Sequence, residues 1–361
     1  MSESAPAPTF RRSELGLPAQ SRHGSIPDID LIARNSRILW STVAAMAVGT
    51  IAAFWMANLS FAWTSAGIIL IWVAIFLAVS GFYRRFRPDP SIMYGTECGA
   101  QLALVFALGC ALSYPLATAG FPYRDAALNA VDTWMGLDWR AYLHFFNERP
   151  LLGTLARLAY GSVLFQSNLL IICLAGRSRL VRLQQYIFAV ALALLMTVAV
   201  FAFVPAGGTY AFLQIAPSEF ANVSPVTTAD QLNQINVLRT GQQTLIDRME
   251  GLITFPSFHA AWAILFMWGF YPIRLLRYGA ILLNLFIIAT TPIQGAHYFI
   301  DLVGGTIVAL AAIYVAVRFM GGRERASQVE NIPAAQEAEG MPAVIMTQDR
   351  GPARSLGGAC L

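Results

Sequence analysis

The chain has few charged residues and no lysine. Only 12% of its 361 residues are charged, about half the share of a typical soluble domain. Hydrophobic residues make up 57%, and all 24 basic side chains are arginines. This composition excludes a disordered chain, a disulfide-stapled module and an ordinary cytosolic enzyme. It predicts a polytopic membrane protein.

Several other signals are missing. Cys98, Cys110, Cys173 and Cys360 show no ligand spacing, so we expect neither a disulfide framework nor a metal site. No short apolar core with a small-residue cleavage site follows the polar start of the chain, so no signal peptide is expected. We attribute the formal net charge of +4 to cytoplasmic loops and expect no nucleic-acid partner.

Apolar runs long enough to cross about 30 Å of hydrocarbon follow the polar start. In lipid these runs must be helical, because open strand edges would leave backbone groups unpaired. We predict an all-α membrane bundle of about eight spans within a membrane domain at 37–319, with disordered cytoplasmic tails at 1–36 and 320–361. The runs lie near 37–59, 64–83, 98–119, 152–175, 182–204, 256–272, 276–292 and 297–319.

The arginines are distributed unevenly between the connections of these spans. Short loops at 60–63 and 293–296 contain no arginine, and they lie on the same predicted side as the long loops at 120–151 and 205–255. Because short cytoplasmic loops are enriched in basic residues, we predict that both termini are cytoplasmic and that the long loops are extracytoplasmic. The arginine-rich set comprises the N-terminal tail, Arg84 to Arg87, Arg177 to Arg182, Arg274 with Arg277, and Arg323 with Arg325.

Residues 122–147, within the first long loop, have an amphipathic pattern. Leucine and aromatic side chains alternate there with Asp132, Asp138 and Arg140. Tryptophan and tyrosine suit the headgroup layer, so we expect this segment to lie along the outer interface. Two roles fit the pattern, a surface cap or a lid over a lipid entrance, and the cap is the favoured one.

The first of two histidine motifs is Phe-Pro-Ser-Phe-His-Ala at 255–260, at the outer start of the sixth predicted span. Proline is favoured in the first turn of a helix, so we expect Pro256 to lie there. The free N–H groups of that turn would form an anion site, Ser257 would add a hydroxyl donor, and His259 would stand beside it. By itself the motif also fits a capped membrane helix with an interfacial histidine.

The second motif runs from Gly295 to Asp301 and is followed by Gly304 and Gly305. His297 and Asp301 are four residues apart, so on a helix they share one face. The carboxylate would accept a hydrogen bond from one imidazole nitrogen and make the other a better base or nucleophile. The two glycines would let a neighbouring helix come close. A pair that only packs helices is the alternative, but ionisable groups within a span usually mark function.

The predicted topology brings both motifs to the same extracytoplasmic face. Two histidines, a carboxylate and a helix N-terminus would then converge on a phosphate. One imidazole would attack phosphorus, and the other would protonate the leaving oxygen. No acidic cluster suited to Mg²⁺ accompanies the motifs, so neither a metal nor another cofactor is expected.

On these residues the chain resembles the phosphatidic acid phosphatase type 2 superfamily, over roughly residues 150–319. The Gly-x-His-Tyr-x-x-Asp pattern at 295–301 is similar to that of inositol-phosphorylceramide synthases and related bacterial membrane proteins. The resemblance implies a six-helix phosphatase-type core, His297 as the nucleophile forming a phosphohistidine, Asp301 as its orienting group and His259 as the acid and base. It also implies a multi-pass protein of a bacterial inner membrane.

The chain differs from the superfamily in its basic residues. Without lysine it cannot carry the superfamily's lysine-containing motif, Phe258 replaces the usual glycine, and Thr290-Thr291 stand where Ser-Arg is usual. A transferred phosphate still needs charged donors, and the candidates besides Ser257 are Arg239, Arg248 and Arg157. Arg157 fits snorkelling to the headgroups equally well.

Three classes of function remain open. The favoured one is a membrane phosphotransferase that moves a phosphate-linked headgroup between phospholipid or sphingolipid substrates, and a lipid phosphate phosphatase would use the same intermediate. A proton-coupled transporter could use the histidines and Asp301 as a relay, although the chain lacks evident inverted repeats. The third class is a scaffold without catalytic activity, because the arginine of the superfamily's Ser-Arg pair is missing from this chain. Donor, acceptor and oligomeric state have no signature in the sequence.

Overall fold

The computed structural model describes residues 29–246 and 251–321, except for the side chains of 63–66. In these residues the fold is helical apart from two two-residue strands, β1 (Ser60–Phe61) and β2 (Leu245–Ile246), which pair in parallel. The long apolar helices are α1 (Ile29–Met56), α2 (Trp63–Arg85), α3 (Pro90–Ala117), α6 (Pro150–Gly161), α7 (Val163–Ala175), α8 (Leu180–Phe203), α11 (Phe258–Phe270), α12 (Arg277–Gln294) and α13 (Phe299–Met320). The shorter elements are α4 (Asp125–Trp134), α5 (Trp139–Asn147), α9 (Thr209–Phe212), the 3₁₀ helix η2 (Pro217–Phe220) and α10 (Asp230–Arg239).

Each predicted span contains a helix, but fewer of them are long and apolar enough to cross a membrane alone. Five helices meet that condition, namely α1, α2 from Gly67, α3, α8 and α13. Helices α6 and α7 add a sixth if they form one span, since they are bent by 48° at the break between them. Helix α11 has only 13 residues, which gives about 20 Å of length. Helix α12 interrupts its apolar sequence with Asn284, Thr290, Thr291 and Gln294.

The first helix begins earlier than the sequence pattern predicts. Helix α1 starts at Ile29, so residues 29–36 are helical and do not belong to the predicted tail. Packing explains the difference, because Ile32 is buried, Asn35 Nδ2 donates to the Met320 carbonyl at 3.0 Å and Ser36 bonds Glu97. The predicted tail residues 1–28 and 322–361 lie outside the described residues.

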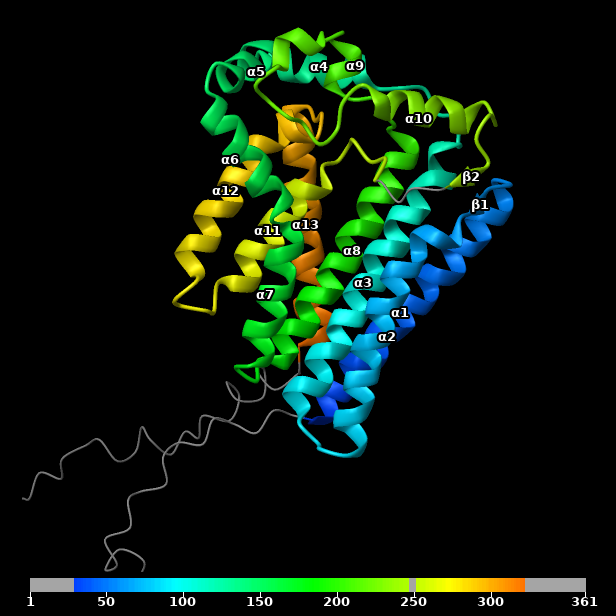
Figure 1. Cartoon of the computed structure of the whole chain (residues 1–361), viewed down its shortest axis with the longest axis vertical. Helices are drawn as coiled ribbons and strands as arrows, with labels where there is room; N and C mark the ends of the chain where they lie inside the picture. Colours follow the sequence, from blue (N-terminus) through cyan, green and yellow to red (C-terminus); the bar gives the residue numbers. More distant parts are fainter. Residues whose placement is uncertain (1–28, 247–250, 322–361) are drawn as a thin grey trace, which may run out of the picture. The chain divides into compact units, whose positions relative to one another are not determined.

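Helix α8 forms the centre of the bundle, surrounded by α1, α3, α7, α11 and α13 (Figure 1). Its sequence is apolar around its whole circumference, as expected of a helix buried on every face, and Tyr186, Ile187, Ala189 and Val190 have no exposed surface. The outer helix α2 contacts mainly α3 and has large exposed apolar side chains, including Trp72. This pattern fits a helix that faces lipid.

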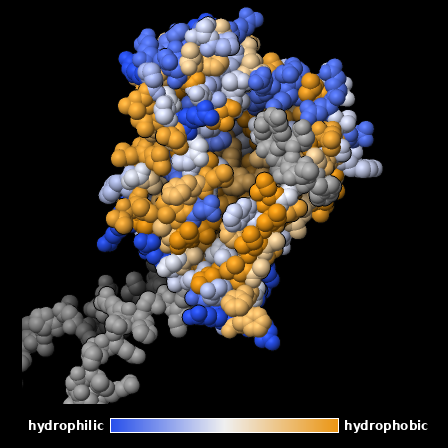
Figure 2. All heavy atoms as spheres, viewed as in Figure 1, coloured by the Kyte–Doolittle hydropathy of each residue, from blue (hydrophilic) through white to orange (hydrophobic). Residues whose placement is uncertain are grey.

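The bundle has two chemically different ends. Helices α4, α5, α9 and α10 lie across one end, above the start of α13 (Figure 1). The arginine-rich connections α2–α3, α7–α8 and α11–α12 lie towards the other end. On the face shown in Figure 2, apolar residues occupy the middle of the bundle and hydrophilic residues gather near both ends. Several long apolar helices with this distribution fit a multi-pass membrane protein.

Candidate active site

The structure brings His297 and Asp301 into direct contact. His297 Nδ1 lies 3.1 Å from Asp301 Oδ2, and both side chains are buried. The contact does not arise from a shared helix face, because α13 begins only at Phe299 and Tyr298 is its N-cap. Asp301 lies in the first turn, where its Oδ2 also accepts the Tyr298 N–H at 3.0 Å. The carboxylate that caps the helix therefore also orients the imidazole in the turn before it.

A tight turn between α12 and α13 carries His297. Ala296 adopts a left-handed backbone conformation with φ 57°, and its carbonyl accepts the Thr209 N–H at 3.1 Å. The His297 N–H donates to the Pro292 carbonyl at 3.1 Å. These contacts fix the turn that carries the histidine.

The second histidine is held by a tyrosine that the sequence motifs do not include. Tyr160 Oη on α6 lies 3.0 Å from Nδ1 of His259 on α11. The two rings also stack, with centroids 4.0 Å apart and planes 17° apart. Hydrogen bonding and stacking together fix the orientation of the imidazole. Tyr160 is separated from His259 by 99 residues, so no local motif could reveal the pair.

Gly295 is the point at which the two histidine pairs meet. A Cβ atom built on Gly295 would lie 2.5 Å from Tyr160 Oη and 2.9 Å from His297 Nε2. The Tyr160 hydroxyl and Nε2 of His297 therefore face the same small space beside the Gly295 backbone. Because Tyr160 also contacts His259, the two predicted catalytic histidines line one site.

The start of α11 is joined to the start of α13. Ser257 is the N-cap of α11 and accepts the Ala260 N–H at 3.3 Å, while its own N–H donates to the Asp301 carbonyl at 3.0 Å. Pro256 thus lies just before the cap, not in the first turn as expected. A Cβ at Gly305 would overlap the Ser257 carbonyl. Glycine at 305 thus permits the close helix approach that the sequence predicts.

Helices α4 and α5 cover this site and bond to it. Asp132 accepts the N–H groups of Phe299 and Ile300 at 2.7 and 2.9 Å, and Trp139 Nε1 donates to the His297 carbonyl at 3.0 Å. Burial raises the pKa of the Asp132 carboxyl, while the two N–H donors act in the opposite direction. The amphipathic segment at 122–147 therefore docks its buried face on the turn that carries His297.

Asp125 forms a second connection between this cap and the site. Its carboxylate accepts the N–H groups of Gly207 and Gly208 at 2.9 to 3.0 Å and the Tyr298 hydroxyl at 2.8 Å. It thus ties α4, the loop after α8 and the N-cap of α13 together. Tyr298 belongs to the histidine motif at 295–301, but its bond to Asp125 could not be inferred from the sequence, because the two residues are 173 positions apart.

The candidate phosphate-binding arginines are not gathered around the histidines. Arg239 donates from Nε to the Ala117 carbonyl at 3.0 Å and lies 4.2 Å over the Tyr123 ring. Arg157 is an exposed residue of α6, three positions before Tyr160. Arg248 lies outside the described residues. In the part of the chain that the structure describes, no three His, Cys, Asp or Glu side chains are grouped to hold a metal ion.

Two uncharged polar side chains near His297 have no hydrogen-bond partner within residues 29–246 and 251–321. They are the Thr209 hydroxyl and the Gln294 side-chain amide, and neither residue has exposed surface. Thr209 bonds the Ala296 carbonyl through its backbone, and Gln294 precedes Gly295. Buried polar groups normally have partners, so these two are available to a bound substrate.

A protein-family model described as the PAP2 superfamily matches residues 126–315, which is more than half of the 361-residue chain. The match covers α4 to most of α13, including both histidine motifs and Tyr160. No curated protein and no solved structure matches the chain.

Proposed function

Because the chain belongs to the PAP2 superfamily, whose members are generally phosphatases acting on phosphate esters, we propose that it is a membrane enzyme that transfers a phosphate-linked headgroup between lipids. It would act in the manner of inositol-phosphorylceramide synthases, through a covalent phosphohistidine. The superfamily membership and the apolar helices support a membrane enzyme of the phosphatase type. The site geometry supports the finer assignment.

The observation that carries the proposal is the pair of different partners on the two Nδ1 atoms. Asp301 Oδ2 already accepts the Tyr298 N–H, so we take it to accept from Nδ1 of His297 as well, which leaves a lone pair on Nε2. The Tyr160 hydroxyl can accept from Nδ1 of protonated His259, which then carries on Nε2 the hydrogen that it can give to a leaving oxygen. His297 is then prepared as a nucleophile, and His259 as an acid.

The reaction follows from these protonation states in two steps. Nε2 of His297 attacks the phosphorus of the donor lipid, and the bond from phosphorus to the donor's diacylglycerol-type oxygen breaks as His259 gives that oxygen its proton. The acceptor hydroxyl then loses its proton to His259 and attacks the phosphorus. The P–N bond breaks, and both histidines return to their starting states.

The phosphate needs donors that the superfamily's lysine and arginine would otherwise supply. We assign the charged contact to Arg157, because it has no hydrogen bond or ion pair within the described residues and lies one helical turn from Tyr160 on a neighbouring face. Arg239 fits a structural role, since its contacts are with Ala117 and Tyr123. Arg248 in the loop before Ser257 remains a second candidate. Ser257, Thr209 and Gln294 would add uncharged donors.

The helices α4 and α5 that cover the site favour transfer over hydrolysis. His297 is 3% exposed beneath Trp139 and the cap helices. Restricting water access protects a covalent intermediate from hydrolysis, so a lipid hydroxyl entering from the membrane would compete well. A lipid phosphate phosphatase is the second candidate, because hydrolysis is the general activity of the superfamily. We place the site on the extracytoplasmic face, since it lies at the end of the bundle opposite the arginine-rich connections.

Product analysis tests this function. Purified protein in detergent is incubated with phospholipids labelled in the headgroup, with and without a ceramide or diacylglycerol acceptor, and the products are identified by mass spectrometry. Transfer predicts a new headgroup lipid only when the acceptor is present. Release of water-soluble phosphate instead would identify the phosphatase. Turnover by the His297→Ala variant would contradict both.

A further inference from the structure

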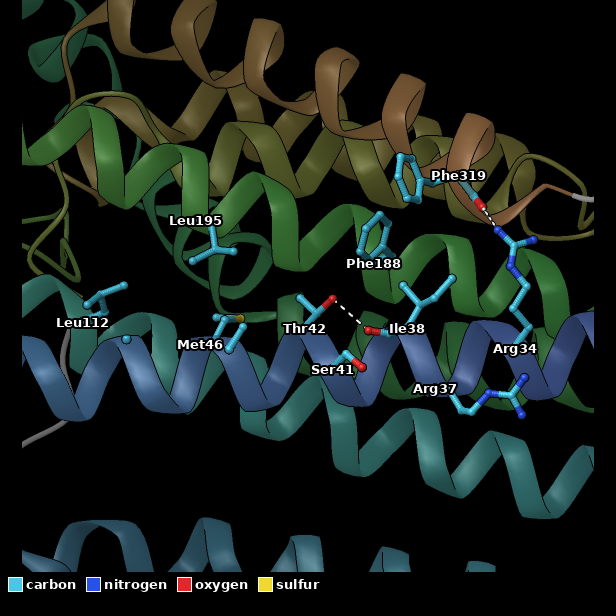
Figure 3. A pocket seen from close by; sticks show the side chains of 12 residues that line it. Arg34, Arg37, Ile38, Ser41, Thr42, Met46, Leu112, Phe188, Leu195 and Phe319 are labelled. Atoms are coloured by element: carbon cyan, nitrogen blue, oxygen red, sulfur yellow. Dashed lines mark hydrogen bonds between the residues drawn. The ribbon is translucent and has the colours of Figure 1, made fainter.

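A groove runs along α1, starting at the end of the bundle remote from the histidines. Its volume is about 670 Å³, and residues of α1, α3, α8 and α13 line it. Figure 3 shows Arg34, Arg37 and Phe319 at one end and Leu112, Met46 and Leu195 at the other. The groove is therefore cationic at one end and apolar along the rest of its length.

The cationic end has unused hydrogen-bond donors. One Nη of Arg34 donates to the Phe319 carbonyl at 2.9 Å near the C-terminus of α13, which leaves the other guanidinium N–H groups free for a ligand. Arg37 is exposed and forms no hydrogen bond or salt bridge within the described residues. No acidic side chain is among the residues that line the groove. Two positive charges thus face it without a negative partner.

The length of the groove suits one lipid. From Arg34 to Gly49 the α1 helix advances fifteen residues, or about 22 Å. One leaflet contributes about half of the roughly 30 Å hydrocarbon core, and the headgroup layer adds several ångströms. A phosphate at the arginines would place an acyl chain along Ile38, Met46 and Leu195.

We propose that this groove binds an anionic phospholipid from the leaflet on the arginine-rich side of the membrane. A phosphate would lie between Arg34 and Arg37, where guanidinium forks make paired contacts with its oxygens. An anionic headgroup is favoured over a zwitterionic one, because a choline-type ammonium would add a third positive charge beside the two arginines, and no carboxylate is among the residues that line the groove. The bound lipid is not the substrate, since the histidines lie at the other end of the bundle.

Two groove variants, each with a matched control, separate the contribution of the arginines to lipid binding from that of the apolar part of the groove. Arg34→Gln/Arg37→Gln removes the cations, and Arg85→Gln/Arg87→Gln removes two exposed arginines of the same end that do not line the groove. Ala45→Trp fills the apolar part, whereas Ala44→Trp adds the same ring to an exposed position of α1 outside it. If the double variant does not fold, Arg37→Gln alone replaces it, because Arg37 has no hydrogen bond to lose within the described residues.

The measurement is the apparent Kd of the delipidated full chain for phosphatidylglycerol and phosphatidylcholine, by native mass spectrometry. Inorganic phosphate and glycerol 3-phosphate are separate arms that distinguish a free anion from a lipid. We expect phosphatidylglycerol to bind at least tenfold more tightly than phosphatidylcholine, and Arg34→Gln/Arg37→Gln and Ala45→Trp each to weaken it about tenfold or more. The control variants should bind normally. Equal affinity for both lipids, unchanged binding by the two groove variants, or glycerol 3-phosphate binding as tightly as the lipid would overturn the proposal.

Discussion

The hydroxyl of Tyr160 lies 3.0 Å from Nδ1 of His259, and the two rings stack with centroids 4.0 Å apart. This contact mirrors the one between Asp301 and His297, but with a phenol in place of a carboxylate. A carboxylate that accepts from Nδ1 leaves Nε2 of His297 as a base, whereas a phenol oxygen can accept from Nδ1 of protonated His259 without neutralising its charge, so the two histidines are prepared for opposite proton transfers. The expected behaviour of a Tyr160 variant follows from this difference.

Tyr160→Phe should slow reactions with poor leaving groups more than reactions with good ones. Without the hydroxyl, protonated His259 loses the acceptor of its Nδ1 hydrogen and protonates the leaving oxygen less well. We expect kcat to fall about tenfold or more, roughly 1.4 kcal/mol, for an alkyl phosphodiester. It should change little for a p-nitrophenyl ester, whose leaving group needs no proton.

Tyr186→Phe is the matched control for that variant. Tyr186 is equally buried and accepts a hydrogen bond from Trp262 Nε1 at 3.0 Å. Its loss removes one buried contact without touching the histidines, so kcat should stay near wild type with both substrates. An equal loss on both substrates in Tyr160→Phe would mean that Tyr160 only supports the fold.

Gly295→Ala should inactivate the enzyme. The added methyl group would approach Tyr160 Oη and His297 Nε2 to within 3 Å, so both side chains must move out of the positions in which they face each other. The φ of Gly295 is −111°, which alanine adopts without strain, so the effect comes from these side-chain overlaps. We expect kcat/KM to fall at least a hundredfold, about 2.7 kcal/mol, and the apparent Tm to fall as well, because both displaced side chains are buried.

Gly279→Ala serves as the control on the same helix, because a Cβ there meets nothing within 4 Å. Its activity should match the wild type. If Gly295→Ala also turned over normally, the small space beside Gly295 would not be the reaction site.

Arg157 and Arg239 should respond differently to replacement by lysine. Lysine keeps the charge but cannot copy a bidentate guanidinium, so Arg157→Lys should lower kcat/KM about tenfold or more at an unchanged Tm. Arg239→Lys should instead lower the Tm, because it loses the bond to Ala117 and the stacking on Tyr123. The reverse pattern in activity and thermal-unfolding assays would transfer the phosphate contact to Arg239.

The membrane face of the site can be tested with single cysteines. Ser224→Cys and Thr240→Cys, each on a background without the four native cysteines, should react with an impermeant maleimide in intact cells, because both residues are exposed at the capped end. A cysteine in place of exposed Arg177, at the other end, should react only after lysis. Labelling in the opposite order would move the active site to the cytoplasmic face.

Much of this architecture could be predicted from hydropathy and local motifs. Spans show as apolar runs because lipid requires them, and His297 with Asp301 are close because they are four residues apart. Where α13 begins was less predictable, since Asp301 caps the helix and leaves His297 in the preceding turn. Tyr160 could not be inferred, because only the packing of α6 against its neighbours brings it to His259.

Helices α4 and α5, which cover the site, show the same limit of prediction from a single sequence. Their amphipathic pattern predicts a surface segment, and Trp134 is indeed 85% exposed. The pattern does not reveal that Asp132 and Trp139 bind the turn around His297, since these hydrogen bonds join residues more than 150 positions apart. Long-range polar contacts to backbone groups leave no periodic signal in a single sequence.

The central claim is that Nε2 of His297 forms a covalent bond to the phosphorus of the substrate. The most direct test is rapid quenching during turnover of a phospholipid carrying ³²P, followed by peptide mapping. The account predicts protein-bound label that survives alkali, is lost in acid and maps to His297, and that disappears on adding acceptor lipid. Absence of protein-bound label during confirmed turnover, or label on another residue, would contradict it.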